Sequence, residues 1–337
     1  MPIRITLKMI AARAGVHITT VSLALKDHPS LPETTRQRIK DLAAEMGYVR
    51  DPLLSALVAY RTNNRLAVKQ GVLAWVDVWP TPGGAREAYP ELWQGAFERA
   101  EKLGWKLEAF RPIHSGITLA QCSRILRARG IQGVVIAPVY KDQNTVELEW
   151  PWFSAVSPSH SLVAPRLHRI VTHQAHNMRV LCQKLHRLGF RRPGLVLEAR
   201  EQAIGFNWYS SFIGVQYAQG EPAGIIPPLE QLQFDGAGFM AWFRQHRPDA
   251  LILAKPADYI DALKSAGVRM PEDVLIAVPR PPVGAETEAS WSVDECWGEI
   301  GRHTVDILVG MMHRNEKGVP PNPLTISVDG ILKETIR

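Results

Sequence analysis

From residue 71 onward, short apolar runs alternate with amphipathic helical patterns, and this alternation constrains the fold more than any other feature of the sequence. The runs GVLAWVDVW (71–79), GVVIAPV (133–139) and DALILA (249–254) have the length and apolar character of buried strands. Helical patterns occupy positions such as 90–103 and 259–267. Strands that alternate with helices predict doubly wound parallel sheets. The length of this region suits two such α/β subdomains.

The first 60 residues follow a different rhythm, with three short helical patterns. Thr6 stands where an N-cap is expected, Gly15 ends the first pattern, and the segment 28–32 is a turn because a residue before proline avoids helical geometry. Gly47 is placed for a C-cap of the third helix. The inward faces of the three patterns are Leu7, Ile10, Ala11 and Ala14; Thr20, Val21, Ala24 and Leu25; and Ile39, Leu42, Ala43 and Met46. A fourth helix is predicted over about 52–60, capped by Asp51, and a polar linker over 61–65.

The positive charge of the chain is concentrated at this end. The whole chain has a formal net charge of +6, and residues 1–65 carry ten Lys or Arg against five acidic residues, a net charge of +5. A basic segment of this kind is expected to lie on phosphates. The remaining residues are close to neutral.

Composition and leader patterns bear on the class and compartment of the protein. Hydrophobic residues make up 46% and charged residues 21%, as in a soluble globular protein. No apolar run approaches the ~20 residues of a membrane span, and the first 15 residues lack a signal-peptide pattern. Three distant cysteines favour unpaired thiols. We therefore expect a cytoplasmic protein without a membrane partner.

The first two helical patterns together predict a helix-turn-helix, in which the second helix enters the DNA major groove. Its outward residues can contact thymine methyl groups, base edges or phosphates. They are Ile18, Thr19, Ser22, Leu23 and Lys26. The alternative is a small helical cap on an α/β domain.

The residues of this segment resemble the head of the lactose-repressor (LacI/GalR) family. The resemblance runs without a gap from about residue 5 to residue 60 and is weaker over 67–337. It rests on Ile5-Thr6-Leu7-Lys8-Met9-Ile10-Ala11, Ala14-Gly15-Val16, Thr20-Val21-Ser22, Thr35-Arg36 and Gly47-Tyr48. It implies a helix-turn-helix domain at 1–50, a hinge helix and linker at 51–65, and a periplasmic-binding-protein-like effector and dimerisation domain at 66–337. The expected N-subdomain is about 66–163 with 293–320, and the C-subdomain is about 164–292 with 321–337.

The resemblance implies a homodimer that binds a pseudo-palindromic site in double-stranded operator DNA. Its hinge helices would enter the minor groove, where Leu57 would wedge between base pairs; ordinary dimer packing of Leu57 is the alternative. The residues expected to contact DNA are Thr6, Leu7, His17, Ile18, Thr19, Thr20, Ser22, Leu23, Lys26, Thr35, Arg36, Leu54 and Leu57.

Three positions depart from the family pattern. His17 stands where many members have a small hydroxyl residue as N-cap, Leu23 replaces a long polar base-reading residue, and Arg50-Asp51 replaces the usual Pro-Asn. These changes predict an operator that differs from those of the sugar-utilisation members.

The effector half also departs from the family pattern. His176, Trp208 and Pro279-Arg280 occupy positions where members often carry sugar-binding Asp or Arg residues. The chain has ten tryptophans, and their aromatic faces can stack on a carbohydrate or on a planar ligand. Core or dimer-interface roles for the tryptophans, or a cleft that no longer binds a small molecule, are the alternatives. The candidate effector residues are Trp79, Tyr89, His176, Trp208, Arg280 and Trp297.

No cofactor, metal or catalytic site is predicted. His168, His173 and His176 lack a strong metal-binding spacing, and no acid that would support them is evident. Nucleophile-elbow, Walker and dinucleotide patterns are missing. We therefore expect a non-enzymatic, ligand-responsive transcriptional repressor of unknown effector. The alternatives are an activator, a ligand-independent regulator, a solute-binding protein and, least favoured, an enzyme with a fused head.

Overall fold

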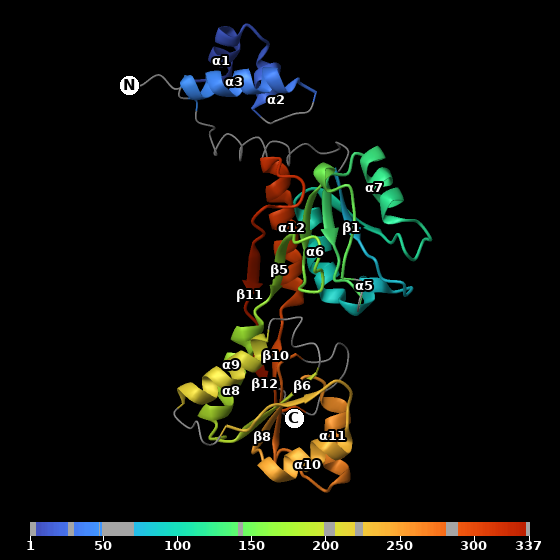
Figure 1. Cartoon of the computed structure of the whole chain (residues 1–337), viewed down its shortest axis with the longest axis vertical. Coiled ribbons are helices and arrows are strands. Elements are labelled where there is room, and N and C mark those ends of the chain that lie inside the picture. Colours follow the sequence, from blue (N-terminus) through green and yellow to red (C-terminus); the bar gives the residue numbers. More distant parts are fainter. Residues whose placement is uncertain are drawn as a thin grey trace. The chain divides into compact units, whose positions relative to one another are not determined.

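The computed structural model describes residues 5–25, 30–46, 48, 71–140, 144–198, 206–219, 225–280 and 289–334. The chain forms two compact units, one comprising residues 1–70 with 311–316 and the other 71–310 with 317–337. We call the described residues 5–48 the head, and the second of these units the large unit (Figure 1).

The head consists of α1 (Leu7–Ala14), α2 (Ile18–Ala24) and α3 (Glu33–Glu45), as the sequence predicts. The Thr6 hydroxyl accepts a hydrogen bond from the Met9 amide and caps α1, and Gly15 ends it in the left-handed conformation at φ 68°. The buried core of the head is Ile10, Ala11, Val21, Ala24, Ile39 and Ala43. The expected fourth helix at 52–60 and the expected cap Gly47 lie outside the described residues.

The first sheet of the large unit is parallel, in the order β11-β5-β4-β3-β1-β2. Successive side chains of its strands point to opposite faces of the sheet, and both faces are packed. In β1, Ala74 and Val76 join a core with Cys122 of α7, whereas Trp75 makes an edge-on contact with Trp93 of α6. The strands are β1 (Gly71–Val76), β2 (Trp105–Phe110), β3 (Gly133–Ile136), β4 (Ser154–Ser157), β5 (His168–Thr172) and β11 (Thr325–Val328). The accompanying helices are α5 (Gly84–Ala88), α6 (Pro90–Lys102), α7 (Leu119–Ala128) and α12 (Trp297–Arg314), with a 3-10 turn at Trp150–Trp152.

The second sheet has the order β12-β10-β9-β8-β6-β7 and is parallel except for β12. Helices α8 and α9 cover one face and α10 and α11 the other (Figure 1), each pair packing into its own apolar core. The strands are β6 (Pro193–Glu198), β7 (Leu229–Gln231), β8 (Ala250–Leu253), β9 (Leu275–Val278), β10 (Trp291–Asp294) and β12 (Ile331–Glu334). The helices are α8 (Gln174–Arg187), α9 (Asn207–Ala218), α10 (Gly236–His246) and α11 (Pro256–Ser265).

The observed strand pairing places the points at which the chain crosses between the two sheets later in the sequence than expected. The sequence placed them near 163, 292 and 320, but β5 and β11 belong to the first sheet and β10 to the second. The crossings therefore follow Thr172, Asp294 and Val328. The error has a physical reason: β5 and β11 are only five and four residues long and rich in polar side chains, so neither reads as a buried strand.

The three cysteines are unpaired, as expected. Burial raises the pKa of Cys122 to about 11 and that of Cys182 to about 12, so both thiols stay protonated at neutral pH. Within the described ranges, no helix combines the length and apolar character that a membrane span needs.

Candidate functional site

Helix α2 presents one open face and one packed face. Val21 and Ala24 are fully buried in the head, whereas Ile18 is 39% exposed and Thr19 is also exposed. Ser22 and Leu23 are half-buried on the open side. The open face therefore carries two hydroxyl groups and two apolar side chains, which can contact base edges and thymine methyl groups.

The amino end of α2 is capped by a histidine. The Thr19 amide donates to His17 Nδ1 at 3.4 Å, and the Thr19 hydroxyl lies 2.9 Å from the same nitrogen. A backbone amide can only donate, so Nδ1 is the acceptor and a neutral His17 carries its hydrogen on Nε2. His17 thus takes the place of a hydroxyl cap, and its exposed ring keeps Nε2–H as a hydrogen-bond donor at this end of α2.

The other expected DNA contacts differ in their surroundings. Thr6 is exposed, while Leu7, Thr20 and Thr35 are half-buried. Arg36 is largely covered, with a side chain 17% exposed that forms an ion pair with Glu33. This pair reduces the charge that Arg36 can present to a phosphate. Three expected contacts lie outside the described residues: Lys26, Leu54 and Leu57.

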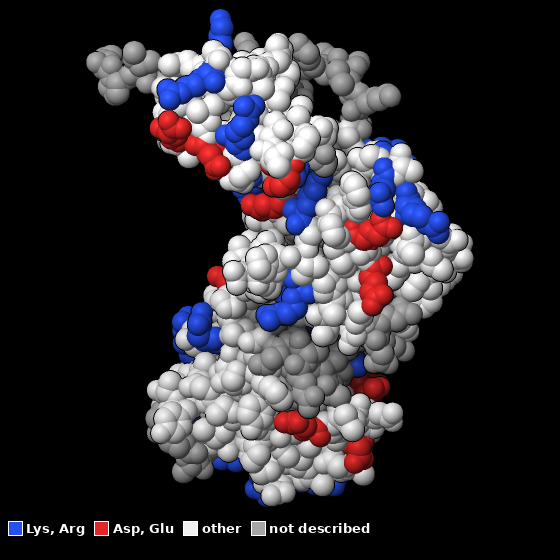
Figure 2. Space-filling view, turned by 45° about the horizontal axis from the view of Figure 1, so that its top comes forward, with Lys and Arg blue, Asp and Glu red and all other residues white. Residues whose placement is uncertain are grey.

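Basic and acidic groups are interspersed on the described part of the head. Arg13 pairs with Glu45 at 3.4 Å, and Arg38 reaches the Ala14 carbonyl at 3.5 Å. The view of the head in Figure 2 shows both signs of charge among uncharged side chains. On the face shown, the described part of the head therefore presents individual cations among acidic and uncharged groups.

In the large unit, four aromatic side chains gather at the carboxyl ends of β1 and β3 and at the start of α12. The ring of Tyr89 lies 6.4 Å from Trp79 and 4.9 Å from Trp297, and Trp79 lies 4.9 Å from Tyr140. The Trp79 indole donates to the Pro138 carbonyl at 2.6 Å. This aromatic cluster contains three of the six candidate effector residues.

A buried carboxylate lies beside the aromatic cluster. Glu295, 2% exposed, accepts from Gln174 Nε2 at 2.9 Å and from the Trp297 indole at 3.0 Å. Burial raises its pKa, and the positive charge of Arg280 partly offsets that effect. Gln174 Oε1 is buried and has no hydrogen-bond partner among the described residues. We call Gln174, Arg280, Glu295 and Trp297 the junction cluster.

A second buried carboxylate shapes the loop that carries Trp79. Asp77, directly after β1, accepts from the Trp79 and Ala85 amides, both at 2.9 Å. Burial raises its pKa, and the two amides and Arg111, 3.7 Å away, oppose the rise. Gly84 has φ 62°, and a Cβ there would collide with the Asp77 carboxylate. The loop conformation therefore depends on glycine at this position.

The remaining candidate effector residues lie apart from the aromatic cluster. Trp208 is buried in the core of the second sheet with Met178 and Phe212, so its ring packs against the protein interior. His176 lies in the first turn of α8, near His173 and Asp329. Arg280 joins the junction cluster only through its charge at Glu295.

The head also matches a known family. Residues 6–51 match the family described as bacterial regulatory proteins, lacI family. The head is a lacI-family DNA-binding domain. The chain is also similar to three curated regulators. The chain is 26% identical over 132 residues to the HTH-type transcriptional regulator DegA of Bacillus subtilis and 30% identical over 136 residues to the maltose regulon regulatory protein MalI of Escherichia coli. It is 39% identical over 61 residues to the HTH-type transcriptional regulator GntR of Pseudomonas aeruginosa.

These sequence matches cover part of each protein. They span 39%, 40% and 18% of this chain and 36%, 36% and 18% of the respective relatives. The chain therefore spans well under half the length of each of these curated relatives in the matched segment.

Solved structures extend the likeness to the whole fold. A transcriptional regulator CelR–cellobiose complex aligns with 98% of both chains at TM-score 0.54 and 18% identity. The lac repressor dimer bound to operator and the anti-inducer ONPF aligns with 99% of both chains at TM-score 0.54 and 15% identity. At these identities the likeness establishes the architecture: a helix-turn-helix head followed by two parallel-sheet subdomains like those of periplasmic binding proteins.

Several residues near these sites were not predicted from the sequence. Glu295 follows β10, a short strand that the sequence analysis did not identify, and Gln174 and Tyr140 follow β5 and β3. A rule that ligands bind beyond the carboxyl ends of parallel strands could have selected them once each strand was known. Asp329 directly follows β11, so the same rule could have selected it once that strand was known.

Proposed function

We propose that the chain is a transcriptional repressor that binds a pseudo-palindromic operator in double-stranded DNA as a homodimer. The observation that carries the proposal is the open face of α2, formed by Ile18, Thr19, Ser22 and Leu23 on a helix whose other face is buried. Two heads of a dimer would then read half-sites about one helical turn, roughly 34 Å, apart.

The composition of this face favours a specific kind of operator. Leu23 and Ile18 cannot hydrogen-bond a guanine, but both can pack on thymine methyl groups. Thr19, Ser22 and the Nε2 of His17 supply short-range polar contacts. We expect half-sites rich in A·T pairs where Leu23 and Ile18 lie.

A small polar molecule is the proposed effector, bound by the aromatic and junction clusters. Gln174 Oε1 and the Glu295 carboxylate are buried acceptors, and Trp79, Tyr89 and Trp297 supply faces for stacking. Acceptors beside aromatic rings suit a ligand with hydroxyl groups and an apolar face, such as a carbohydrate. Support by analogy comes from the relatives crystallised with cellobiose or with ONPF.

The first test is selection of bound sequences from random DNA duplexes by the full chain. A two-fold-symmetric site, bound with one dimer per duplex, is the expected result. Recovery of asymmetric sequences, or of none, would overturn the operator proposal. Repression is then tested by placing the selected site over a reporter promoter. Expression should fall when the regulator is present, and a rise would show that the protein is an activator rather than a repressor.

The effector is tested by repeating DNA binding with a panel of mono- and disaccharides and other polar metabolites. A true effector should change operator affinity in the unmodified chain and lose that effect in Glu295→Ala. The matched control is Glu299→Ala, which removes an exposed carboxylate that lies in the first turn of α12 and pairs with Arg302. If no molecule in a broad panel changes binding, a ligand-independent regulator becomes the better description.

A further inference from the structure

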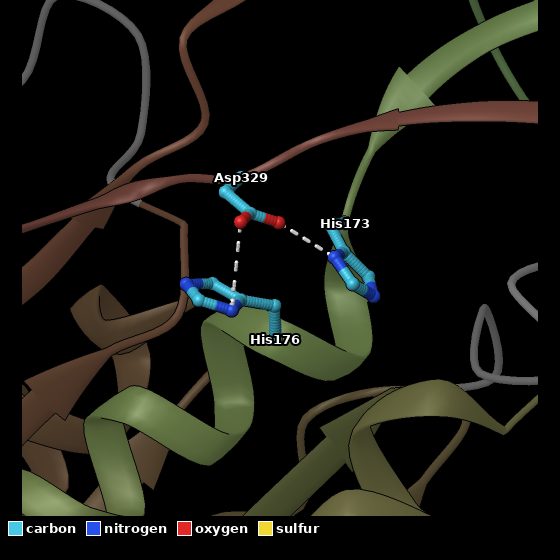
Figure 3. Close-up of side chains that lie close together, drawn as sticks. All are labelled: His173, His176 and Asp329. Atoms are coloured by element: carbon cyan, nitrogen blue, oxygen red, sulfur yellow. Dashed lines mark hydrogen bonds and ion pairs between the residues drawn. The ribbon is translucent and has the colours of Figure 1, made fainter.

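Three side chains from two crossings of the chain converge in the large unit. His173 directly follows β5, Asp329 directly follows β11, and His176 lies in the first turn of α8. His173 Nδ1 is 2.6 Å from Asp329 Oδ1, and His176 Nδ1 is 3.8 Å from Asp329 Oδ2. Figure 3 shows the carboxylate facing both imidazole rings, which are stacked with centroids 5.5 Å apart. We call these residues the crossover triad.

The backbone around the triad is firmly held. Strands β5 and β11 pair in register at Thr172 and Val328, so the residues that follow them emerge side by side. The His173 amide donates to the Val328 carbonyl at 2.8 Å. Fully buried Asn177 donates to the Thr172 hydroxyl at 3.1 Å and accepts from the Gly330 amide at 3.0 Å. Asn177 thus ties together the two segments that carry His173 and Asp329.

We propose that the crossover triad binds a divalent transition-metal ion of the Zn²⁺ type. Each residue offers one ligand atom, and these atoms all lie within 4.8 Å of one another. Two imidazole nitrogens and one carboxylate oxygen are ligands that Zn²⁺ prefers, whereas Mg²⁺ and Ca²⁺ prefer oxygen alone. Three protein ligands leave a fourth position for water.

The triad has room to adopt the required geometry. Ligand atoms about 2.0–2.1 Å from a tetrahedral Zn²⁺ are about 3.3 Å apart, so the more distant ligand atoms must approach by up to about 1.5 Å, while His173 Nδ1 and Asp329 Oδ1 must separate slightly. The side chains of His173 and Asp329 are 40% and 61% exposed, which allows this rotation and gives the ion access from solvent. No metal was predicted from the sequence, because the histidines lack a strong metal-binding spacing and no acid was evident near them. Asp329 lies 156 residues from His173.

One neighbouring group opposes the ion. The Arg179 guanidinium donates to His176 Nδ1 at 3.0 Å and must leave before that nitrogen can bind a metal. The ion must also displace the hydrogen shared between His173 and Asp329, so affinity should rise with pH. Removing Arg179 should therefore tighten metal binding, an effect that a purely structural His–Asp contact would not produce.

Because the triad draws ligands from two of the three crossings, a bound ion would fix these segments to each other and to α8. The ion would thereby restrict the rotation of one sheet relative to the other. This consequence concerns the large unit alone and does not depend on DNA binding or on the identity of an effector.

The test measures Zn²⁺ affinity of the full chain, without a histidine tag, by competition with a chromophoric chelator. One ion per chain is expected, with affinity at least tenfold lower in His173→Gln and in Asp329→Asn. Arg179→Gln should bind several times more tightly than the unmodified chain. His303→Gln removes an exposed histidine of α12 and is the matched control, expected to leave the affinity unchanged. Mg²⁺ at the same concentrations should not compete.

X-ray absorption on the Zn²⁺-loaded unmodified chain gives a test that does not depend on the folding of any variant. Two imidazole ligands and additional oxygen are the expected first shell. A shell with fewer than two imidazoles or with sulfur, equal affinity in the triad variants and the control, or no ion bound to the unmodified chain would each overturn the proposal.

Discussion

Leu23 is the residue that we propose to determine most directly which operator the chain prefers. It is half-buried on the open face of α2 and has no hydrogen-bonding group. In Leu23→Ala, discrimination at one base pair per half-site should fall about tenfold, because a mismatched pair costs about 1–3 kcal/mol. The measurement is binding to a set of single-substitution operators. An equal loss of affinity at every sequence would contradict the assignment of Leu23 as a base-reading residue.

Arg36 provides the contrasting variant. A phosphate contact carries no sequence information, so Arg36→Ala should weaken binding evenly across the same operators. The salt dependence should also become shallower, by about 0.9 in the slope of log K against log salt for one lost contact. Because Arg36 also pairs with Glu33 and is largely covered, the substitution can also change stability, so thermal unfolding of the Arg36→Ala variant must be measured in parallel.

Glu295 gives a prediction for the pH dependence of stability. Burial raises its pKa above the ordinary 4.5, so ionisation disfavours the folded state. Its contribution to stability is present below pH 4.5 and is lost as the pH rises through the raised pKa. In Glu295→Gln, the Tm difference from the unmodified chain should therefore become more positive as pH rises above 4.5. Gln174 can turn its amide to keep the hydrogen bond.

Glu299 supplies a control of opposite sign. The Arg302 side chain lowers the pKa of Glu299, so this group contributes stability that is present above pH 4.5 and is lost as the pH falls through its folded pKa. The Tm difference for Glu299→Gln should become slightly more negative as pH rises. The same trend in both variants would exclude Glu295 burial as the cause.

At the scale of elements, the crossing of α6 and α12 depends on glycine. A Cβ at Gly301 would collide with the Leu92 carbonyl, and one at Gly95 would collide with the Gly298 carbonyl. Gly301→Ala should lower the free energy of unfolding by about 1–3 kcal/mol, because backbone atoms cannot make room without shifting a helix. Urea unfolding of the full chain measures the change.

Gly214 in the middle of α9 tests whether the effect arises from packing. Nothing lies within 4 Å of a Cβ at this position. Gly214→Ala should raise stability by up to ~1 kcal/mol, since alanine favours a helix interior. If both alanine variants changed stability in the same direction, close helix packing would not explain the result at Gly301.

Elements with strong periodicity could be predicted from the sequence. Helix α6 was expected at 90–103 and spans Pro90–Lys102, and the apolar run at 133–139 contains strand β3 at Gly133–Ile136. The three helices of the head were also predicted, together with Thr6 as a cap. In these segments local propensity, spacing and burial all favour the same structure.

The parts that could not be predicted depend on contacts between distant residues. Strands β5, β10, β11 and β12 are short and partly polar, so their pairing partners determine them more than their own composition. The junction cluster and the crossover triad follow from these strands, which explains why Glu295 and Asp329 were missed. Trp208 was proposed to contact an effector, but its neighbours on α8 and α9 place it in a core.

At the scale of the whole molecule, the division into two compact units predicts that the large unit folds alone. A fragment of residues 71–337 contains every described strand of both sheets, together with the aromatic cluster and the junction cluster. It should unfold cooperatively, bind the effector with unchanged affinity and have no measurable affinity for the selected operator. Circular dichroism, calorimetry and fluorescence anisotropy measure these properties. A fragment that fails to fold would show that the large unit requires residues 1–70.

The placement of β11 and β12 has a consequence for synthesis. Residues 325–328 form an edge of the first sheet, and residues 331–334 form an edge of the second. During translation the lacI-family head emerges before the large unit and has its own core, so it can fold while the ribosome is still working. The first sheet lacks this edge strand until residue 328 leaves the exit tunnel, and the second sheet lacks its edge strand until residue 334 does. A ribosome that stalls before codon 325 would therefore release a chain able to form a DNA-binding head but no complete subdomain to control it.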